Sequence, residues 1–146
     1  MHVEIRSQAF DPWRECADYQ RAHLPAGRQG AAAVFVGTMR DFNEGDAVVG
    51  MTLEHYPDMT ERELERLLAQ AGERWDLVDG LILHRVGELR PDEPIVLVAV
   101  WSAHRKDAFE ACRWLMEELK SNVPFWKKER LADGTERWVE RNTPGY

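Results

Sequence analysis

One uninterrupted apolar run constrains the fold of this 146-residue chain more than any other feature: Ile95-Val96-Leu97-Val98-Ala99-Val100. Successive side chains of a β-strand point to opposite faces of the sheet, so this run presents apolar groups on both faces. Strands of that kind lie inside a sheet, because a half-exposed position would leave one apolar face in water. We therefore predict a central strand over residues 94–101.

Further strand signals come from segments rich in small, β-branched or aromatic residues. The clear ones lie at residues 31–37, 48–56 and 80–86, and the weaker ones at residues 3–6, 125–131 and 137–139. Asp133-Gly134 separates the last two, and this dipeptide is a good signal for a hairpin turn. The last two segments are therefore predicted to form a β-hairpin.

Apolar residues at helical spacing predict two helices. The first follows Thr60-Glu61-Arg62-Glu63, whose spacing matches a capping box. Its apolar face comprises Leu64, Leu67, Leu68, Ala71 and Trp75. The second helix runs from about residue 103 to residue 120, and Pro124 prevents it from going much further. A shorter helix is predicted over residues 12–23, where Asp11 supplies an N-cap before a proline in the first turn.

The predicted order is strand, helix, two strands, helix, two strands, helix and hairpin. Neighbouring strands without an intervening helix favour antiparallel pairing, so the predicted class is α+β. The chain has the length of one domain and contains no internal repeat, low-complexity stretch or linker. We expect a single domain over residues 1–146, with helices packed on a mostly antiparallel sheet.

The overall charge argues against some classes of partner. The formal net charge of −7 is unfavourable for a general binder of nucleic acid or of membrane surfaces. No apolar run reaches the roughly 18 residues needed to cross a bilayer, and the N-terminus lacks the layout of a signal peptide. We therefore expect a cytoplasmic protein. In that reducing compartment Cys16 and Cys112 are not expected to form a disulfide, and two isolated thiols make no zinc site.

Basic residues gather locally in spite of the acidic total. His104, Arg105 and Lys106 crowd the start of the last predicted helix, where free backbone N–H groups already favour negative charge. A bound anion such as a phosphate would account for this cluster. The alternative is that the three side chains extend into water, and the position alone leaves both interpretations open.

A second candidate lies in the segment from Lys120 to Glu129. Strand alternation would place Lys127 on the same face as Phe125 and Lys128 on the opposite face. Lys127 could then line a pocket with a lowered pKa and act as a base or nucleophile, while Lys128 is solvated. An ordinary strand without a site is the alternative that the spacing alone favours.

Two weaker signals come from a loop and from the histidines. The polar loop at residues 37–46 follows a predicted strand and holds Arg40, but it lacks the glycine spacing of a phosphate loop. His55, His84 and His104 could converge on a metal, yet a hydrogen-bonded structural histidine is commoner beside strands and helix starts. We expect no metal site, and nothing resembles the nucleophile elbow of a hydrolase.

Six segments, taken together and in order, resemble the large subunit of molybdopterin synthase. They are Phe35-Val36-Gly37-Thr38-Met39-Arg40-Asp41, Leu53-Glu54-His55-Tyr56-Pro57-Asp58-Met59, His84-Arg85-Val86-Gly87, Ser102-Ala103-His104-Arg105, Pro124-Phe125-Trp126-Lys127-Lys128-Glu129 and Trp138-Val139-Glu140. Each segment alone is a weak signal, whereas six in register from about residue 30 to residue 141 are specific.

This resemblance implies an α/β hammerhead-type fold that pairs as a homodimer at the centre of a heterotetramer. A small ubiquitin-like subunit would dock on each outer end and insert a C-terminal Gly-Gly tail that carries a thiocarboxylate. The implied enzyme is a sulfurtransferase of molybdenum cofactor biosynthesis, which converts cyclic pyranopterin monophosphate to molybdopterin by two sulfur transfers. No cofactor is implied, because the partner supplies the sulfur and the chain needs no reactive cysteine of its own.

The resemblance also implies roles for particular residues. Lys120 and Lys127 match the two lysines that carry the chemistry in the family. The positions implied to contact substrate are Thr38, Met39, Arg40, His104, Arg105, Lys128 and Arg141. Among these, Arg40, His104 and Arg105 would hold the pterin phosphate, and Arg141 would reach across the dimer to the neighbouring pocket.

Two other classes of protein stay open at this point. A non-catalytic anion-binding subunit would keep the arginines and His104 but would have no use for Lys120 beside Lys127. An unrelated phosphate-ester enzyme would act without a protein partner and has no reason to contain the continuous segment from Pro124 to Glu129. Binding of a small acidic protein that ends in Gly-Gly is expected only of the synthase.

Overall fold

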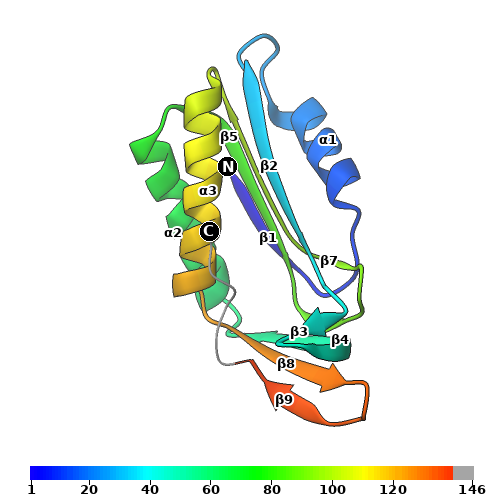
Figure 1. Cartoon of the computed structure of the whole chain (residues 1–146). Coiled ribbons are helices and arrows are strands. Elements are labelled where there is room, and N and C mark those ends of the chain that lie inside the picture. Colours follow the sequence, from blue (N-terminus) through cyan, green and yellow to red (C-terminus); the bar gives the residue numbers. More distant parts are fainter. Residues whose placement is uncertain (140–146) are drawn as a thin grey trace.

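The computed structural model describes residues 1–139 as a large and a small β-sheet, with helices packed on the large one (Figure 1). The strands of the large sheet, in spatial order, are β1 (His2–Arg6), β5 (Leu77–Arg85), β7 (Pro94–Ser102) and β2 (Ala31–Thr38). β1 pairs with β5 in parallel, whereas β5 with β7 and β7 with β2 pair antiparallel. The predicted α+β class with mostly antiparallel pairing is confirmed.

Two helices cover one face of the large sheet and one helix covers the other (Figure 1). α2 (Met59–Arg74) and α3 (Arg105–Asn122) lie on the first face, and α1 (Pro12–His23) lies on the second. α1 begins as predicted, because the Asp11 carboxylate accepts hydrogen bonds from two backbone N–H groups of the first turn, at 3.0 and 3.3 Å. No helix within residues 1–139 is long and apolar enough to cross a membrane.

β7 lies between β5 and β2, and its two faces enter separate apolar cores. The core under α2 and α3 receives Val96, Val98 and Val100, and the core under α1 receives Leu97, Ala99 and Trp101. All six side chains are buried. The prediction of a central strand is therefore confirmed, and the layers on both faces explain why every position of the run is apolar.

The capping box predicted at Thr60 is wrong. α2 begins at Met59, and the preceding residue is Asp58, whose φ of 67° marks a sharp turn of the chain. That turn carries Thr60 into the helix, where its side chain is fully buried and its hydroxyl has no hydrogen-bond partner within the described residues. A side chain that points into the core cannot reach the free N–H groups at the helix start.

The small sheet lies at one end of the large one (Figure 1). Its strands are β3 (Phe42–Asn43), β4 (Asp46–His55), β8 (Phe125–Leu131) and β9 (Glu136–Trp138), and β6 (Gly87–Leu89) also pairs with β4. β8 and β9 form the predicted hairpin, with Gly134 in its turn at φ +89°. β3 and β6 were not predicted, because two or three residues are too few to show a period.

A third apolar core fills the inside of the small sheet and meets the core under α2 and α3. Its buried members are Met39, Val48, Met51, Leu53 and Leu89. Ile95 at the start of β7 and Phe125 at the start of β8 pack against both cores. These two side chains therefore form the joint between the sheets, and the candidate site lies at this joint.

Candidate active site

Two adjoining pockets lie where the large sheet, the end of α3 and the small sheet meet. The residues that line both pockets are Phe35, Gly37, Thr38, Ile95, Lys120 and Lys127. A register shift at Gly37 and Thr38 ends the regular pairing of β2 with β7 at this point. A Cβ at Gly37 would stand 2.9 Å from Val96 and 3.2 Å from Phe35. Glycine is therefore required for this close packing of the cleft wall.

Lys127 reaches the cleft from β8, which pairs with β4 along the small sheet. Phe125, Lys127 and Glu129 share the face of β8 that lines the two pockets. Lys128 lies on the opposite face, where it pairs with Glu136 at 2.8 Å. The predicted alternation, with Lys127 in a pocket beside Phe125 and Lys128 in solvent, is confirmed.

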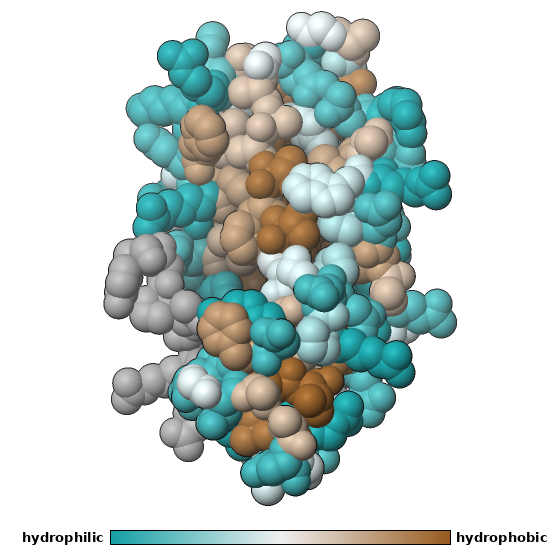
Figure 2. All heavy atoms as spheres, turned by 45° about the vertical axis from the view of Figure 1, so that its right-hand side comes forward, coloured by the Kyte–Doolittle hydropathy of each residue, from teal (hydrophilic) through white to brown (hydrophobic). Residues whose placement is uncertain are grey.

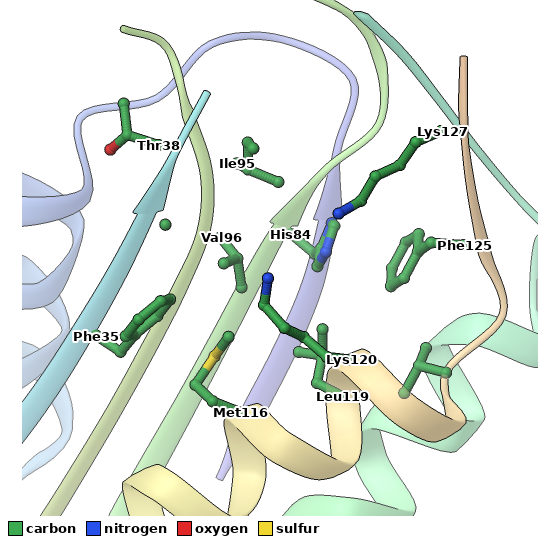
Figure 3. Close-up of a pocket in the computed structure, with 12 residues that line it drawn as sticks. Phe35, Thr38, His84, Ile95, Val96, Met116, Leu119, Lys120, Phe125 and Lys127 are labelled. Atoms are coloured by element: carbon green, nitrogen blue, oxygen red, sulfur yellow. The ribbon is translucent and has the colours of Figure 1, made fainter. Parts of the chain in front are cut away.

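Lys120 reaches the same cleft from the last turn of α3. The ammonium ends of Lys120 and Lys127 both point into the cavity from opposite walls (Figure 3). Burial first of all, together with the nearby charges of Lys120 and Arg40, lowers the pKa of Lys127 to about 8, against the opposing effect of Glu129. Lys127 therefore exchanges a proton closer to neutral pH than an ordinary lysine does.

The floor between the two lysines carries His84 of β5. Its ring stacks on Phe125, with ring centroids 3.8 Å apart, and its Nδ1 lies 2.8 Å from the carbonyl oxygen of Arg85. Burial first of all, and then the charges of Lys127, His55 and Lys120, lower the pKa of His84 to about 3. The histidine is thus uncharged at neutral pH.

The second pocket extends from the lysines toward the loop after β2. It adds Arg40, whose guanidinium lies over the ring of Phe42 at 4.9 Å, and the buried side chain of Met39. Glu129 is the carboxylate that lines this pocket within the described residues. It accepts hydrogen bonds from Asn43 and Arg137, at 3.1–3.2 Å and 3.1 Å. The cleft therefore has an excess of positive charge, which suits an anionic ligand.

The structure does not bring all the predicted residues to this cleft. His104 and Arg105 lie exposed at the opposite end of α3 from Lys120, about 22 Å away at 1.5 Å per residue. Lys128 points away, toward Glu136 and the ring of Trp138. Arg141 lies outside the described residues. Thr38, Met39, Arg40, Lys120 and Lys127 are brought together.

Sequence reasoning missed two residues of the cleft. His84 was interpreted as a structural histidine, because a hydrogen-bonded histidine within a strand is more often structural than a metal ligand. Glu129 could have been found from strand alternation, since it follows Lys127 by two residues. For His84 no sequence signal distinguishes a floor residue of a cleft from a core residue.

Comparison with known proteins identifies the family. A family model described as MoaE protein matches residues 5–122. The chain belongs to the MoaE family. The molybdopterin synthase catalytic subunit of Ralstonia nicotianae, a MoaE relative, is 56% identical over 140 residues, which cover 94% of this chain and 76% of that protein. The resemblance seen in the sequence is thereby confirmed.

Solved structures of MoaE relatives share the fold. The crystal structure of molybdopterin synthase from Staphylococcus aureus matches with a TM-score of 0.83 and 32% identity, over 94% of this chain and 96% of that chain. A more distant match, at 22% identity, is a complex of subunits 1 and 2 of molybdopterin-converting factor from Helicobacter pylori. It gives a TM-score of 0.78 over 94% of this chain and 90% of that chain, and it supports the MoaE fold alone.

Proposed function

We propose that this chain is the catalytic subunit of a molybdopterin synthase, and that it acts in the cytoplasm on cyclic pyranopterin monophosphate. The observation that carries the proposal is the pair of lysines that face one another across a cation-rich cleft with an apolar wall. Such a cleft can hold a phosphate and a second anion close together, although the two would repel each other in water.

In this proposal the sulfur comes from a partner and not from a cysteine of this chain. Neither cysteine lines the two pockets, and burial raises the pKa of both thiols, that of Cys112 to about 11. A thiol with a raised pKa is a poor nucleophile at neutral pH. The proposed donor is therefore the C-terminal thiocarboxylate of a small ubiquitin-like subunit, whose Gly-Gly tail is slender enough to enter the cleft. No further cofactor is proposed.

In the proposed reaction the thiocarboxylate sulfur attacks a carbon of the pterin side chain and displaces an oxygen from that carbon, and the displaced oxygen leaves with a proton. The product carries an acyl–sulfur link between the tail and the substrate. Water then cleaves the bond between the acyl carbon and sulfur, which releases the tail as a carboxylate and leaves the sulfur on the pterin. Lys120 assists the addition as a general acid or base or by stabilising negative charge, and Lys127 stabilises the acyl intermediate. A second loaded subunit supplies the other sulfur of the dithiolene.

A single-turnover assay tests the proposal directly. Purified protein, a small subunit that ends in a thiocarboxylate, and the cyclic pyranopterin are expected to yield the dithiolene product. A small subunit that ends in an ordinary carboxylate serves as the control, and it should bind without forming product. Binding without product from the thiocarboxylate form would indicate a scaffold instead of an enzyme. Absence of binding would contradict the proposed partner.

We also propose that two copies pair along β2 and α3, and that pairing completes the site. β2 is an edge strand of the large sheet, and apolar side chains gather in a stripe over this edge (Figure 2). An apolar groove lies between β2 and α3, and Phe109, which is 67% exposed, lines it with Met116. An open sheet edge beside exposed apolar side chains is a surface suited to pairing with a second copy.

Pairing along α3 would bring residues from opposite ends of the helix together across the two copies. A twofold axis that crosses α3 midway between Arg105 and Lys120 brings Arg105 of one copy beside Lys120 of the other. The same axis places Phe109 of one copy opposite Met116 of the other. The pair Phe109 and Met116 has the same midpoint along α3 as the pair Arg105 and Lys120. His104 and Arg105 could then hold the substrate phosphate in the partner's cleft, although they lie far from the cleft of their own chain.

Mixing of two inactive variants tests this arrangement. Lys120→Ala and Arg105→Ala chains are each expected to be inactive as homodimers. An equal mixture, unfolded and refolded together, should recover about a quarter of the wild-type activity, because half of the dimers are mixed and each contains one intact site. Lys120→Ala mixed with Lys127→Ala is the control, since both changes fall in the cleft of their own chain and no intact site forms. Lack of recovery in the first mixture, with mixed dimers shown by mass spectrometry, would contradict the shared site.

A further inference from the structure

His84 has one nitrogen whose role is fixed by the backbone. Its Nδ1 lies 2.8 Å from the carbonyl oxygen of Arg85. A carbonyl can only accept a hydrogen bond, so Nδ1 carries the hydrogen and donates it. In a neutral imidazole the other nitrogen, Nε2, is then an acceptor with a free lone pair.

The ring is held firmly in this state. It is 4% exposed and stacks on Phe125 with an angle of 12° between the ring planes. The titratable groups around it are the cations Lys127 and Lys120 and the ring of His55, and all three oppose its protonation. A second proton on His84 would place another positive charge between two lysines in a site shielded from water.

Lys127 is the neighbour that can use this acceptor. His84 and Lys127 line the same pocket, and Lys127 has the largest effect among the charges that act on His84. The ammonium end of Lys127 and the ring of His84 point toward one another in the cavity (Figure 3). The edge of the ring that faces away from the Arg85 carbonyl is the edge that carries Nε2.

We propose that His84 is a positioning residue for Lys127, in which neutral Nε2 accepts one N–H of the ammonium group and directs the other two toward the bound anions. This inference rests on the function proposed above. A lysine side chain has four rotatable bonds, so an ammonium group without a fixed partner would sample many directions. A carboxylate could also orient it, but would cancel its charge and repel the anionic substrates. A neutral imidazole orients the ammonium group and leaves the positive charge of the cleft intact.

Two substitutions separate this role from simple packing. His84→Phe keeps the bulk of the ring and its stack on Phe125 but removes the acceptor. His84→Gln loses the ring, whereas its amide oxygen can reach the position of Nε2. If the acceptor matters, the glutamine variant should behave more like wild type than the phenylalanine variant does. If packing matters, the order should be reversed.

The first measurement uses NMR of the full-length protein without any substrate. Nitrogen-15 shifts and couplings of His84 should show hydrogen on Nδ1 and none on Nε2 in wild type. Titration of the Lys127 amine should give a pKa about 1 lower in His84→Phe than in wild type, and a nearly unchanged one in His84→Gln, because the accepted hydrogen bond favours the ammonium form. Hydrogen on Nε2, or the same Lys127 titration in all three proteins, would overturn the proposal.

The second measurement is the single-turnover rate against pH. His84→Phe should lower the maximal rate about 10-fold, with substrate affinity unchanged. It should also move the part of the pH–rate profile that follows the titration of Lys127 to lower pH. His84→Gln should restore both the rate and the profile. Equal rates and profiles in all three proteins would overturn the proposal. Because the NMR titration needs no substrate, it tests the contact even if no sulfur transfer is observed. Wild-type NMR alone decides the tautomer if the phenylalanine variant does not fold.

Discussion

Replacement of Lys120 by alanine is expected to lower the single-turnover rate of sulfur transfer at least about 100-fold. Lys120 extends into a cleft where two anions must meet, and removal of one such cationic group from a preorganised site has effects of this order. Rapid quenching and chromatographic measurement of the dithiolene product give the rate. Binding of the small subunit should change little, because the protein surface outside the cleft is untouched.

Lys128→Ala is the matched comparison for this experiment. Lys128 is the same type of residue and lies in the same strand as Lys127, but it faces outward and pairs with Glu136. An exposed ion pair contributes little, so the rate should stay within about threefold of wild type. If Lys120→Ala also stayed within a few-fold, its catalytic role would be wrong. If Lys128→Ala fell as far as Lys120→Ala, the substrate would have to contact the outer face of β8, as the family resemblance implied.

Replacement of Lys127 by methionine is expected to abolish activity and yet make the protein more stable at pH 7, by about 1–2 kcal/mol. The pKa of Lys127 is lowered from 10.5 to about 8, chiefly by burial. At pH 7, below both values, the folded protein must hold a buried ammonium group that the unfolded chain keeps in water. The gap between the two values corresponds to roughly 3 kcal/mol at most, and partial solvation of the side chain reduces this. Methionine retains the apolar bulk without the charge.

The difference in stability between Lys127→Met and wild type should become smaller as the pH rises. Between pH 8 and pH 10.5 the unfolded chain binds more protons at Lys127 than the folded protein does, so the wild-type free energy of unfolding rises with pH across this window. Urea denaturation should therefore show a large difference between Lys127→Met and wild type at pH 7, and a small one near pH 10.5. Groups that titrate in both proteins cancel in this comparison. A methionine variant that is less stable than wild type at pH 7 would contradict the expected effect.

Much of the fold could be predicted because the strongest signals are local. The apolar run of β7, the Asp11 cap of α1 and the Asp133-Gly134 turn each depend on neighbouring residues, and each is confirmed. The capping box at Thr60 failed because the helix starts at Met59 after a sharp turn at Asp58, and the Thr60 side chain is buried in the core. Tertiary packing decides such positions, and a short sequence pattern does not contain it.

The site could be predicted only in part. Strand alternation placed Lys127 and Lys128 on opposite faces of the strand, although the spacing alone favoured an ordinary strand without a site. The family resemblance pointed to Lys120 and Lys127. The separation of Arg105 from Lys120 was implicit in the predicted helix, because fifteen residues of helix span about 22 Å. The place of His84 in the cleft could not be predicted, since β5 and β8, which both line this pocket, are far apart in the sequence.

The joint formed by Ile95 and Phe125 determines how far apart the two lysine charges of the cleft lie. Lys120 belongs to the helical layer of the large sheet and Lys127 to the small sheet, so neither element alone fixes the gap between the two charges. The distance between the two charges therefore depends on how the small sheet packs against the large sheet and its helices. Ile95 and Phe125 act as spacers at the joint, so a change in the volume of either uncharged side chain is expected to change the distance between the two charges.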